Sequence, residues 1–167
     1  EFRRVLFRSL GKTAYALAFV SNGCAYSKYV IVKDSLRSYA TGTIAFSIFV
    51  GVDETMKAED IFKLLNELYS SYEHDYIRNN YLNRGEKELI REDWSFVNDI
   101  LSKYKTTPGT KRDENINSGT KDPAFIYYQD DYELLEYFDK PFQPEYIDYS
   151  QILFIQSNLQ ESLSPIN

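Results

Sequence analysis

The first part of the chain alternates apolar with polar or small side chains at a period of two, which is typical of half-buried strands. In KTAYALAFV, Tyr15, Leu17 and Phe19 alternate with alanines, KYVIVK is a short β-branched run, and TIAFSIFV alternates again. Asn22-Gly23 is a strong signal for a tight turn, and SLRSYATG has the composition of a loop. We therefore predict three consecutive strands with short links, an antiparallel meander.

The pattern then changes to helical spacing. Apolar residues three and four apart predict a long amphipathic helix from about Ala58 to Arg78 and a second helix from about Glu86 to Lys105. The apolar stripe of the second helix consists of Ile90, Trp94, Val97, Leu101 and Tyr104. We expect the two helices to pair as a hairpin and to cover one face of the sheet.

The last third begins with a polar segment, residues 106–122, which predicts an exposed loop. AFIYYQ and SQILFIQ predict two more strands, and DDYELLEYF between them predicts a short helix that Asp130 and Glu133 cap reciprocally. A strand, helix and strand in succession imply a right-handed parallel crossover. The predicted fold is α+β, with a mixed sheet, the order β-β-β-α-α-β-α-β and the helices packed on the sheet.

Residues 1–9, EFRRVLFRS, differ from the rest in being basic. Their codons can be written as the end of a common short-read sequencing adapter in frame, so we interpret them as a non-native translation of that adapter. The predicted domain is then a single unit over residues 10–157. Residues 158–167 have no periodic pattern and are interpreted as a linker to a missing downstream region.

The charge balance excludes some partners. The chain has 19 Lys+Arg and 25 Asp+Glu, a net charge of −6, and setting residues 1–9 aside leaves 16 and 24, or −8. No basic cluster is present, which argues against binding to a nucleic-acid backbone. No run approaches the roughly 18 apolar residues of a membrane span, so we expect the visible part of the protein to be soluble. The expected localisation is cytoplasmic, with a signal sequence upstream of residue 10 left open. The 15 Tyr and 11 Phe fit either codon bias in an AT-rich genome or a tyrosine-rich binding surface.

Motifs for nucleotides, metals or nucleophilic catalysis are weak. Gly11-Lys12-Thr13 ends like a phosphate loop, but a strand follows it where that motif needs a helix. The single Cys24 allows neither an internal disulfide nor a cysteine-based zinc site. His74 is the only histidine, and we interpret it as a solvated helix-surface residue. We expect no cofactor and no metal.

Carboxylates are the remaining enzymatic option, because glycosidase-type or metal-dependent hydrolysis needs two or more of them in one cleft. The candidates are Glu92-Asp93, Asp113-Glu114, Asp130-Asp131, Asp139 and Asp148. Helix capping, an exposed loop and solvated faces account for them without catalysis.

Two residues are candidates for binding. Trp94, in REDWSF, combines with neighbouring charges in the manner of an interaction hot spot, although its place on the apolar stripe favours packing in the core. Arg37 precedes the central strand on the predicted loop, where it would meet an anionic partner or solvent.

Nearly all native residues carry a general resemblance, from YVIVKDSLRSYATGTIAFSIFV through DIFKLLNELYSSY and REDWSFVNDIL to DPAFIYYQDDYELLEYFDKPFQPEYIDYSQILFI. The chain resembles the N-terminal region of large uncharacterised proteins from Bacteroidota. The resemblance implies a bacterial, multidomain and non-catalytic protein, and no site residue is carried over from it.

The main hypothesis is therefore a non-catalytic protein-interaction or sensory N-terminal module of a larger bacterial protein. A carboxylate-dependent hydrolase is one alternative. A small acidic immunity-type protein that binds a basic toxin is the other. The sequence leaves the identity of the protein partner and the oligomeric state open.

Overall fold

A computed structural model describes residues 13–20, 22–34, 37–78, 81–82, 94–109 and 119–157. Its first three strands form the predicted antiparallel meander: β1 (Thr13–Val20), β2 (Gly23–Asp34) and β3 (Arg37–Gly51). Val20 pairs with Gly23 across the first turn, where Asn22 has a φ of 67°. That left-handed conformation suits asparagine, so the turn forms where Asn22-Gly23 predicts it.

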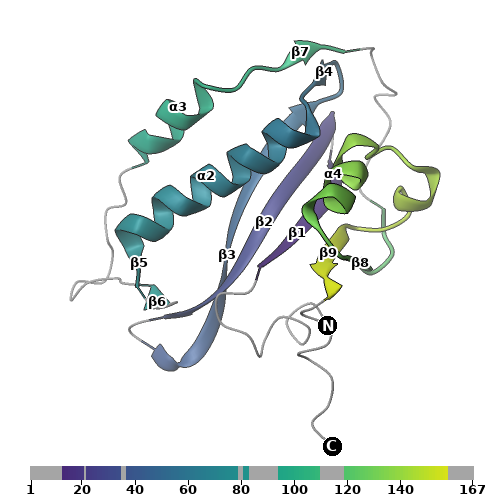
Figure 1. Cartoon of the computed structure of the whole chain (residues 1–167). Helices are drawn as coiled ribbons and strands as arrows, with labels where there is room; N and C mark the ends of the chain where they lie inside the picture. The colour runs from purple at the N-terminus through teal and green to yellow at the C-terminus, as the bar shows by residue number, and fades with distance from the viewer. Residues whose placement is uncertain are drawn as a thin grey trace, which may run out of the picture.

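Two later strands extend the mixed sheet, whose five longest strands lie in the order β3-β2-β1-β9-β8 (Figure 1). β9 (Ile152–Gln156) lies antiparallel to β1, and β8 (Ala124–Tyr128) lies parallel to β9. A parallel neighbour needs a crossover connection, which α4 (Asp131–Asp139) supplies. The α+β class and the mixed sheet are confirmed.

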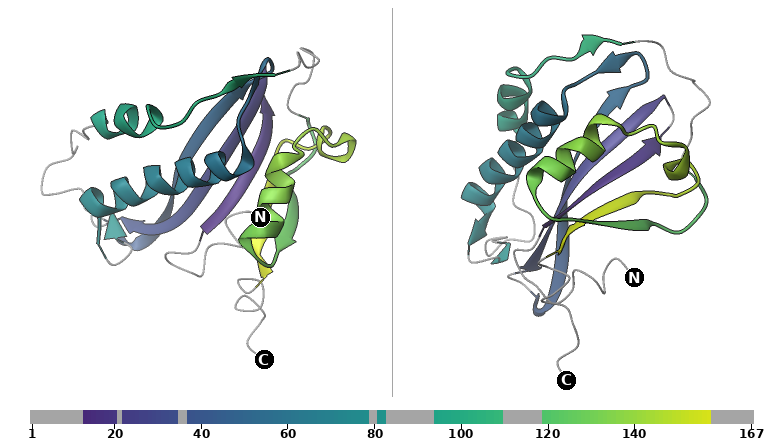
Figure 2. Two further views of the ribbon diagram at one scale, coloured as in Figure 1. Left: turned by 45° about the horizontal axis from the view of Figure 1, so that its top comes forward. Right: turned by 45° about the vertical axis from the view of Figure 1, so that its right-hand side comes forward.

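The described helices lie on one face of the sheet (Figure 2). α2 (Ala58–Tyr76) matches the long predicted helix. It is followed by two short strands, β5 (Ile77–Arg78) and β6 (Tyr81–Leu82), and β6 pairs with the end of β2. α3 (Ser95–Leu101) packs beside α2. The short strands β4 (Glu54–Thr55) and β7 (Thr107–Pro108) pair with each other.

The core lies between this helical layer and the sheet. α2 contributes its apolar stripe, and α4 contributes Leu134 and Phe138. Phe138 makes edge-on ring contacts with Tyr15 of β1, Tyr26 of β2 and Phe154 of β9. One side chain therefore ties α4 to three adjacent strands. The α2 stripe consists of Ala58, Ile61, Leu64, Leu65, Leu68, Tyr69 and Tyr72.

The alanines of β1 face the other side of the sheet. Ala14 and Ala16 are buried. The hydroxyl of Tyr29, on the adjacent β2, lies 3.5 Å from Oε1 of Gln151, which precedes β9. Since β1 lies between these strands, the ring of Tyr29 crosses it, and only small side chains leave room for that crossing.

The capping prediction for α4 is also confirmed. Oδ1 of Asp130 accepts a hydrogen bond from the backbone N–H of Glu133 at 3.0 Å, and Oε2 of Glu133 accepts one from the N–H of Gln129 at 2.9 Å. The first contact satisfies a backbone donor that the first turn of a helix leaves without an intrahelical partner, and the second holds the residue just before the N-cap.

Three predicted boundaries are wrong. The SLRSYATG loop is too long, because β3 already begins at Arg37 in the pairing with β2. The second helix ends at Leu101, four residues before Lys105, and its predicted first part lies outside the described residues. The polar loop contains the strand β7. Residues 1–12, 110–118 and 158–167 lie outside the described residues.

Candidate functional site

The outer edge of β3 is the most unusual surface among the described residues. β3 spans 15 residues and pairs with β2 on one side only in the part of the chain that the structure describes. Residues 38–51 contain no charged residue and no proline. Natural proteins protect edge strands with charges, prolines or short length, and β3 has none of these over most of its length.

The opposite edge of the sheet shows the usual protection. β8 has only five residues. Lys121, Asp122 and Pro123 precede it, and Asp130 follows it closely. The two edges of one sheet therefore differ, which makes the neutral composition of β3 a specific feature and not a property of the whole sheet.

A small apolar groove of about 110 Å³ adjoins the C-terminal half of β3. Its walls are Ile48, Phe49 and Val50 on the strand side and Leu101, Tyr104 and Thr106 across from them. Ile48 and Val50 pack toward the helical layer, where Met56 and Leu64 also line the groove. The groove therefore lies on the helical side of β3, between the strand and the segment that contains Leu101, Tyr104 and Thr106.

Exposure alternates along this strand. Thr43, Ala45, Ser47 and Phe49 are exposed, whereas Phe46 and Val50 are buried against the helical layer. The ring of Phe49 remains 55% exposed. It lies over Gly23, where a Cβ atom would come within 2.5 Å of its Cζ. An apolar ring of this size beside an unpaired edge is a typical element of a binding surface.

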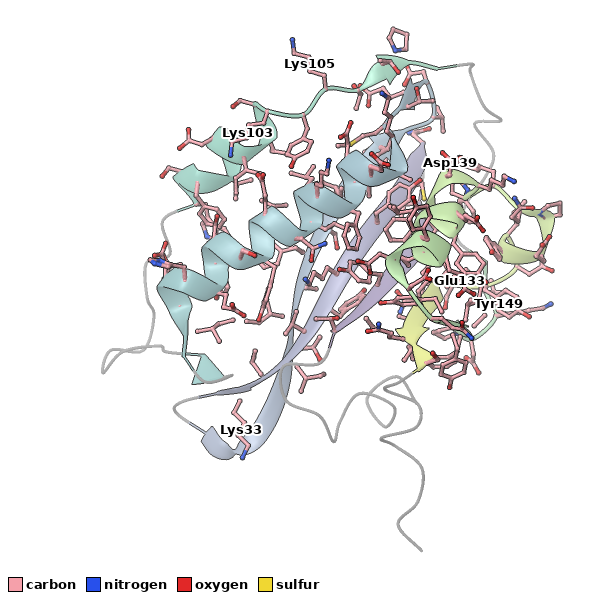
Figure 3. The ribbon with its side chains drawn as sticks, viewed as in Figure 1. Lys33, Lys103, Lys105, Glu133, Asp139 and Tyr149 are labelled. Atoms are coloured by element: carbon pink, nitrogen blue, oxygen red, sulfur yellow. The ribbon has the colours of Figure 1, made fainter. Side chains whose placement is uncertain are left out.

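Few charges surround the groove. Among the described residues, Lys105 is the only charged one that lines it, and Figure 3 shows its side chain pointing away from the domain. Nζ of Lys103 lies 3.6 Å from Oε2 of Glu67. Burial, followed by the charge of Glu67, raises the pKa of Tyr104, so its phenol is neutral at physiological pH. The groove thus presents an apolar, uncharged interior.

A second unusual feature lies inside the domain. Lys28 of β2 points toward the helical layer and is only 7% exposed. Its Nζ donates to Oδ1 of Asn66 on α2 and lies 4.8 Å from the ring centroid of Tyr69. Oδ1 of Asn66 also accepts from the hydroxyl of Tyr15 at 3.1 Å. An amide oxygen and aromatic faces therefore surround this lysine.

Burial lowers the pKa of Lys28 to about 8, against the opposing effects of Glu73 and then Asp131. It also raises the pKa of Tyr15 to about 12, an effect that the hydrogen bond to Asn66 reduces. The pKa values of Tyr69 and Tyr128 are raised as well, with burial as the first cause. Transfer of a charge from water into a poorly solvated site is unfavourable. Lys28 therefore lowers the stability of the folded state at any pH at which it is protonated.

The two predicted binding residues lie apart from the groove. Arg37 is the first residue of β3 and pairs with Asp34, so its placement on a loop is wrong; its side chain lies outside the described part of the molecule. Trp94 stands immediately before α3 and is 48% exposed. Its ring stacks on Tyr72 with a centroid distance of 5.8 Å. The prediction that Trp94 packs in the core, as part of the apolar stripe with Ile90, is therefore wrong.

Sequence reasoning missed the groove and Lys28. Lys28 lies on the same face of β2 as Cys24, Tyr26, Val30 and Val32, which are all buried. A lysine on an otherwise apolar strand face was therefore a signal that the sequence offered for this site. The groove had no such signal, since its two walls come from segments about 50 residues apart in the chain.

The carboxylate candidates within the described residues have separate roles. Asp130 caps α4. Asp148 lies 3.4 Å from Lys121, and Asp139 ends α4, at the opposite end of the helix from the cap (Figure 3). Glu92-Asp93 and Asp113-Glu114 lie outside the described residues. Over the part of the chain that is described, no three His, Cys, Asp or Glu side chains are grouped to hold a metal ion.

His74 is exposed on α2, and its Nδ1 lies 3.0 Å from Asp75, whereas Cys24 is buried in the core. Among the described helices, none is both long and apolar enough to span a membrane. Comparisons with protein-family models, curated proteins and solved structures find no match to this chain.

Proposed function

We propose that the domain is a non-catalytic protein-interaction module of a larger bacterial protein, and that its partner binds as an extra strand along the outer edge of β3. The observation that carries this proposal is the 15-residue strand whose residues 38–51 lack any charge or proline. Along such an edge, alternate N–H and C=O groups point away from β2 and are available to an added strand.

The energetic argument favours a paired edge. Each backbone hydrogen bond to an added strand contributes about 1 kcal/mol net, and a partner that pairs with most of β3 makes several. A long, neutral edge without such a partner invites aggregation. The composition of β3 is therefore a liability unless the edge has a binding partner.

The occupant is an extended segment of another protein. Leu101, Tyr104 and Thr106 form the far wall of the groove beside Ile48–Val50, and its volume of about 110 Å³ suits one side chain of an added strand. A second copy of the chain would bring its own helical layer against this wall. The net charge of −6 also opposes self-association and favours a partner that carries basic residues outside the paired stretch.

The test is a selection of random displayed peptides of about ten residues, a length that matches most of β3, on the intact chain. Enriched peptides should bind the native chain and should lose about tenfold or more in affinity when Thr43→Lys and Ala45→Lys place two charges on the edge. The matched control is Tyr127→Lys, which adds a charge to the opposite edge strand β8 and should leave binding unchanged.

Two results would contradict the proposal. The first is the absence of enriched peptides, or peptides whose affinity is the same for the native chain and the double lysine variant. The second is sedimentation of the native chain as a dimer that the double lysine variant converts to a monomer, because a second copy would then occupy the edge.

A further inference from the structure

The groove beside β3 is positioned to bind one side chain of the added strand. It lies at the height of Ile48–Val50, on the helical side of β3. A strand that pairs there directs every second side chain toward the helical layer. One of these side chains must point between the strand and the wall formed by Leu101, Tyr104 and Thr106.

The chemistry of the groove selects the class of that side chain. Besides Leu101, Ile48 and Val50, its lining includes Met56 and the buried Leu64. The volume of about 110 Å³ is of the same order as the roughly 150 Å³ apolar cavity that accommodates benzene in another protein. A branched aliphatic side chain matches this space.

A charged side chain does not fit this lining. A basic residue would find no acidic partner among the described residues that line the groove. An acidic residue would lose water among aliphatic groups, while Lys105 points away from the domain (Figure 3). Burial of an unpaired charge is unfavourable, so both charge types are selected against.

We infer that the groove is a specificity pocket for one leucine, isoleucine or valine of the bound segment, at the position that faces Ile48–Val50. This inference rests on the proposed function, since the pocket has its ligand only when a strand is added to β3. The paired backbone then supplies general affinity, and the groove supplies the sequence preference.

The test uses a peptide enriched in the selection above, in matched versions that carry Leu or Ala at the anchor position. The native chain should prefer the Leu version by about tenfold or more, because missing methylene groups in an apolar pocket each cost about 1 kcal/mol or more. Leu101 is 41% exposed, so Leu101→Trp is compatible with folding, which circular dichroism verifies.

Two substitutions at Leu101 have opposite expected effects. Leu101→Trp fills the groove and should bring the Leu/Ala affinity ratio close to one, whereas Leu101→Ala widens it and should shift the preference toward Phe or Met. Leu135→Trp, on the partly buried Leu135 of α4, is the matched control and should leave the ratio unchanged.

The outcomes separate the two proposals. If peptides bind and the double lysine variant weakens them, but the Leu/Ala ratio is the same for the native chain and both Leu101 variants, the pocket is wrong and the strand-addition function stands. A charged residue enriched at the anchor position also overturns the pocket. If no peptide binds at the edge of β3, the proposed function fails and the pocket fails with it.

Discussion

Replacement of Lys28 by methionine should stabilise the domain near neutral pH and remove a pH dependence that the native chain carries. Methionine keeps most of the volume of the lysine stem and leaves Asn66 with its hydrogen bond from Tyr15. The change removes a charge that burial holds in a poorly solvated site between β2, α2 and α4. Buried polar groups replaced by apolar groups of similar shape often raise stability.

The magnitude follows from the pKa. Burial lowers the pKa of Lys28 from its ordinary value of 10.5 to about 8, and one pKa unit corresponds to about 1.4 kcal/mol. The protonated lysine therefore destabilises the native state by about 3 kcal/mol at pH 7. Between about pH 8 and 10.5 the unfolded chain binds more protons than the native chain, so the stability of the native protein rises with pH across that window.

The assay is urea unfolding followed by circular dichroism at several values between pH 7.5 and 9.5, with the native chain and the variant compared at each pH. Methionine has no such titration, so the stability advantage of Lys28→Met should shrink by about 2 kcal/mol across this interval. Lys105→Met, at an exposed lysine, is the control and should keep a constant difference from the native chain.

Two results would refute the reasoning. A constant difference between Lys28→Met and the native chain from pH 7.5 to 9.5 would mean that burial does not disfavour the charged amine. An advantage that grows with pH would mean that Asn66, Glu73 and Asp131 stabilise the charge more than burial destabilises it.

Four further substitutions test the packing and the helix cap. Asp130→Ala should lower the free energy of unfolding by about 1 kcal/mol, since it removes the cap of α4; equal stability in urea would disprove that role. Gly23→Ala should destabilise by about 1–3 kcal/mol, because its Cβ would clash with the backbone oxygen of Val50 and come within 2.5 Å of Cζ of Phe49. A thermal melt that matches the native chain would contradict this. Phe138→Ala should lower the free energy of unfolding by about 3–5 kcal/mol, and Trp94→Ala should lower it by well below half of that. Similar losses for the two variants would mean that Trp94 contributes to the core as Phe138 does.

Local sequence patterns predict the fold class because a strand with one buried face alternates apolar and polar residues at a period of two. Ile44, Phe46, Ile48 and Val50 alternate with exposed residues because one face of β3 meets α2, and the pattern requires no distant information. The length of β3 was underestimated for the opposite reason. Residues 37–42 have no strand pattern of their own, and the partner strand β2 holds them extended.

The position of α3 depends on its packing against α2, which the local sequence pattern of α3 does not specify. Trp94, Val97 and Leu101 share a helical stripe, but α3 begins after Trp94 and buries Ile100 most deeply. The surface of α2 on which the helix rests decides which side is covered. The groove arises from the same placement, because residues 101–106 come to lie opposite β3 only after α3 has packed. This is why the candidate site was not predictable.

The position of β9 has a consequence for folding during synthesis. β1 is a central strand, and its second neighbour is β9, so Tyr15 pairs with Phe154 across most of the chain. While the ribosome is still making residues 152–156, the nascent chain has one side of β1 unpaired, even if the meander and α2 have already formed. Contacts of such large sequence separation slow folding. The nascent domain therefore exposes a second unpaired strand for most of its synthesis, and chaperones that bind extended apolar segments have their best opportunity in that interval.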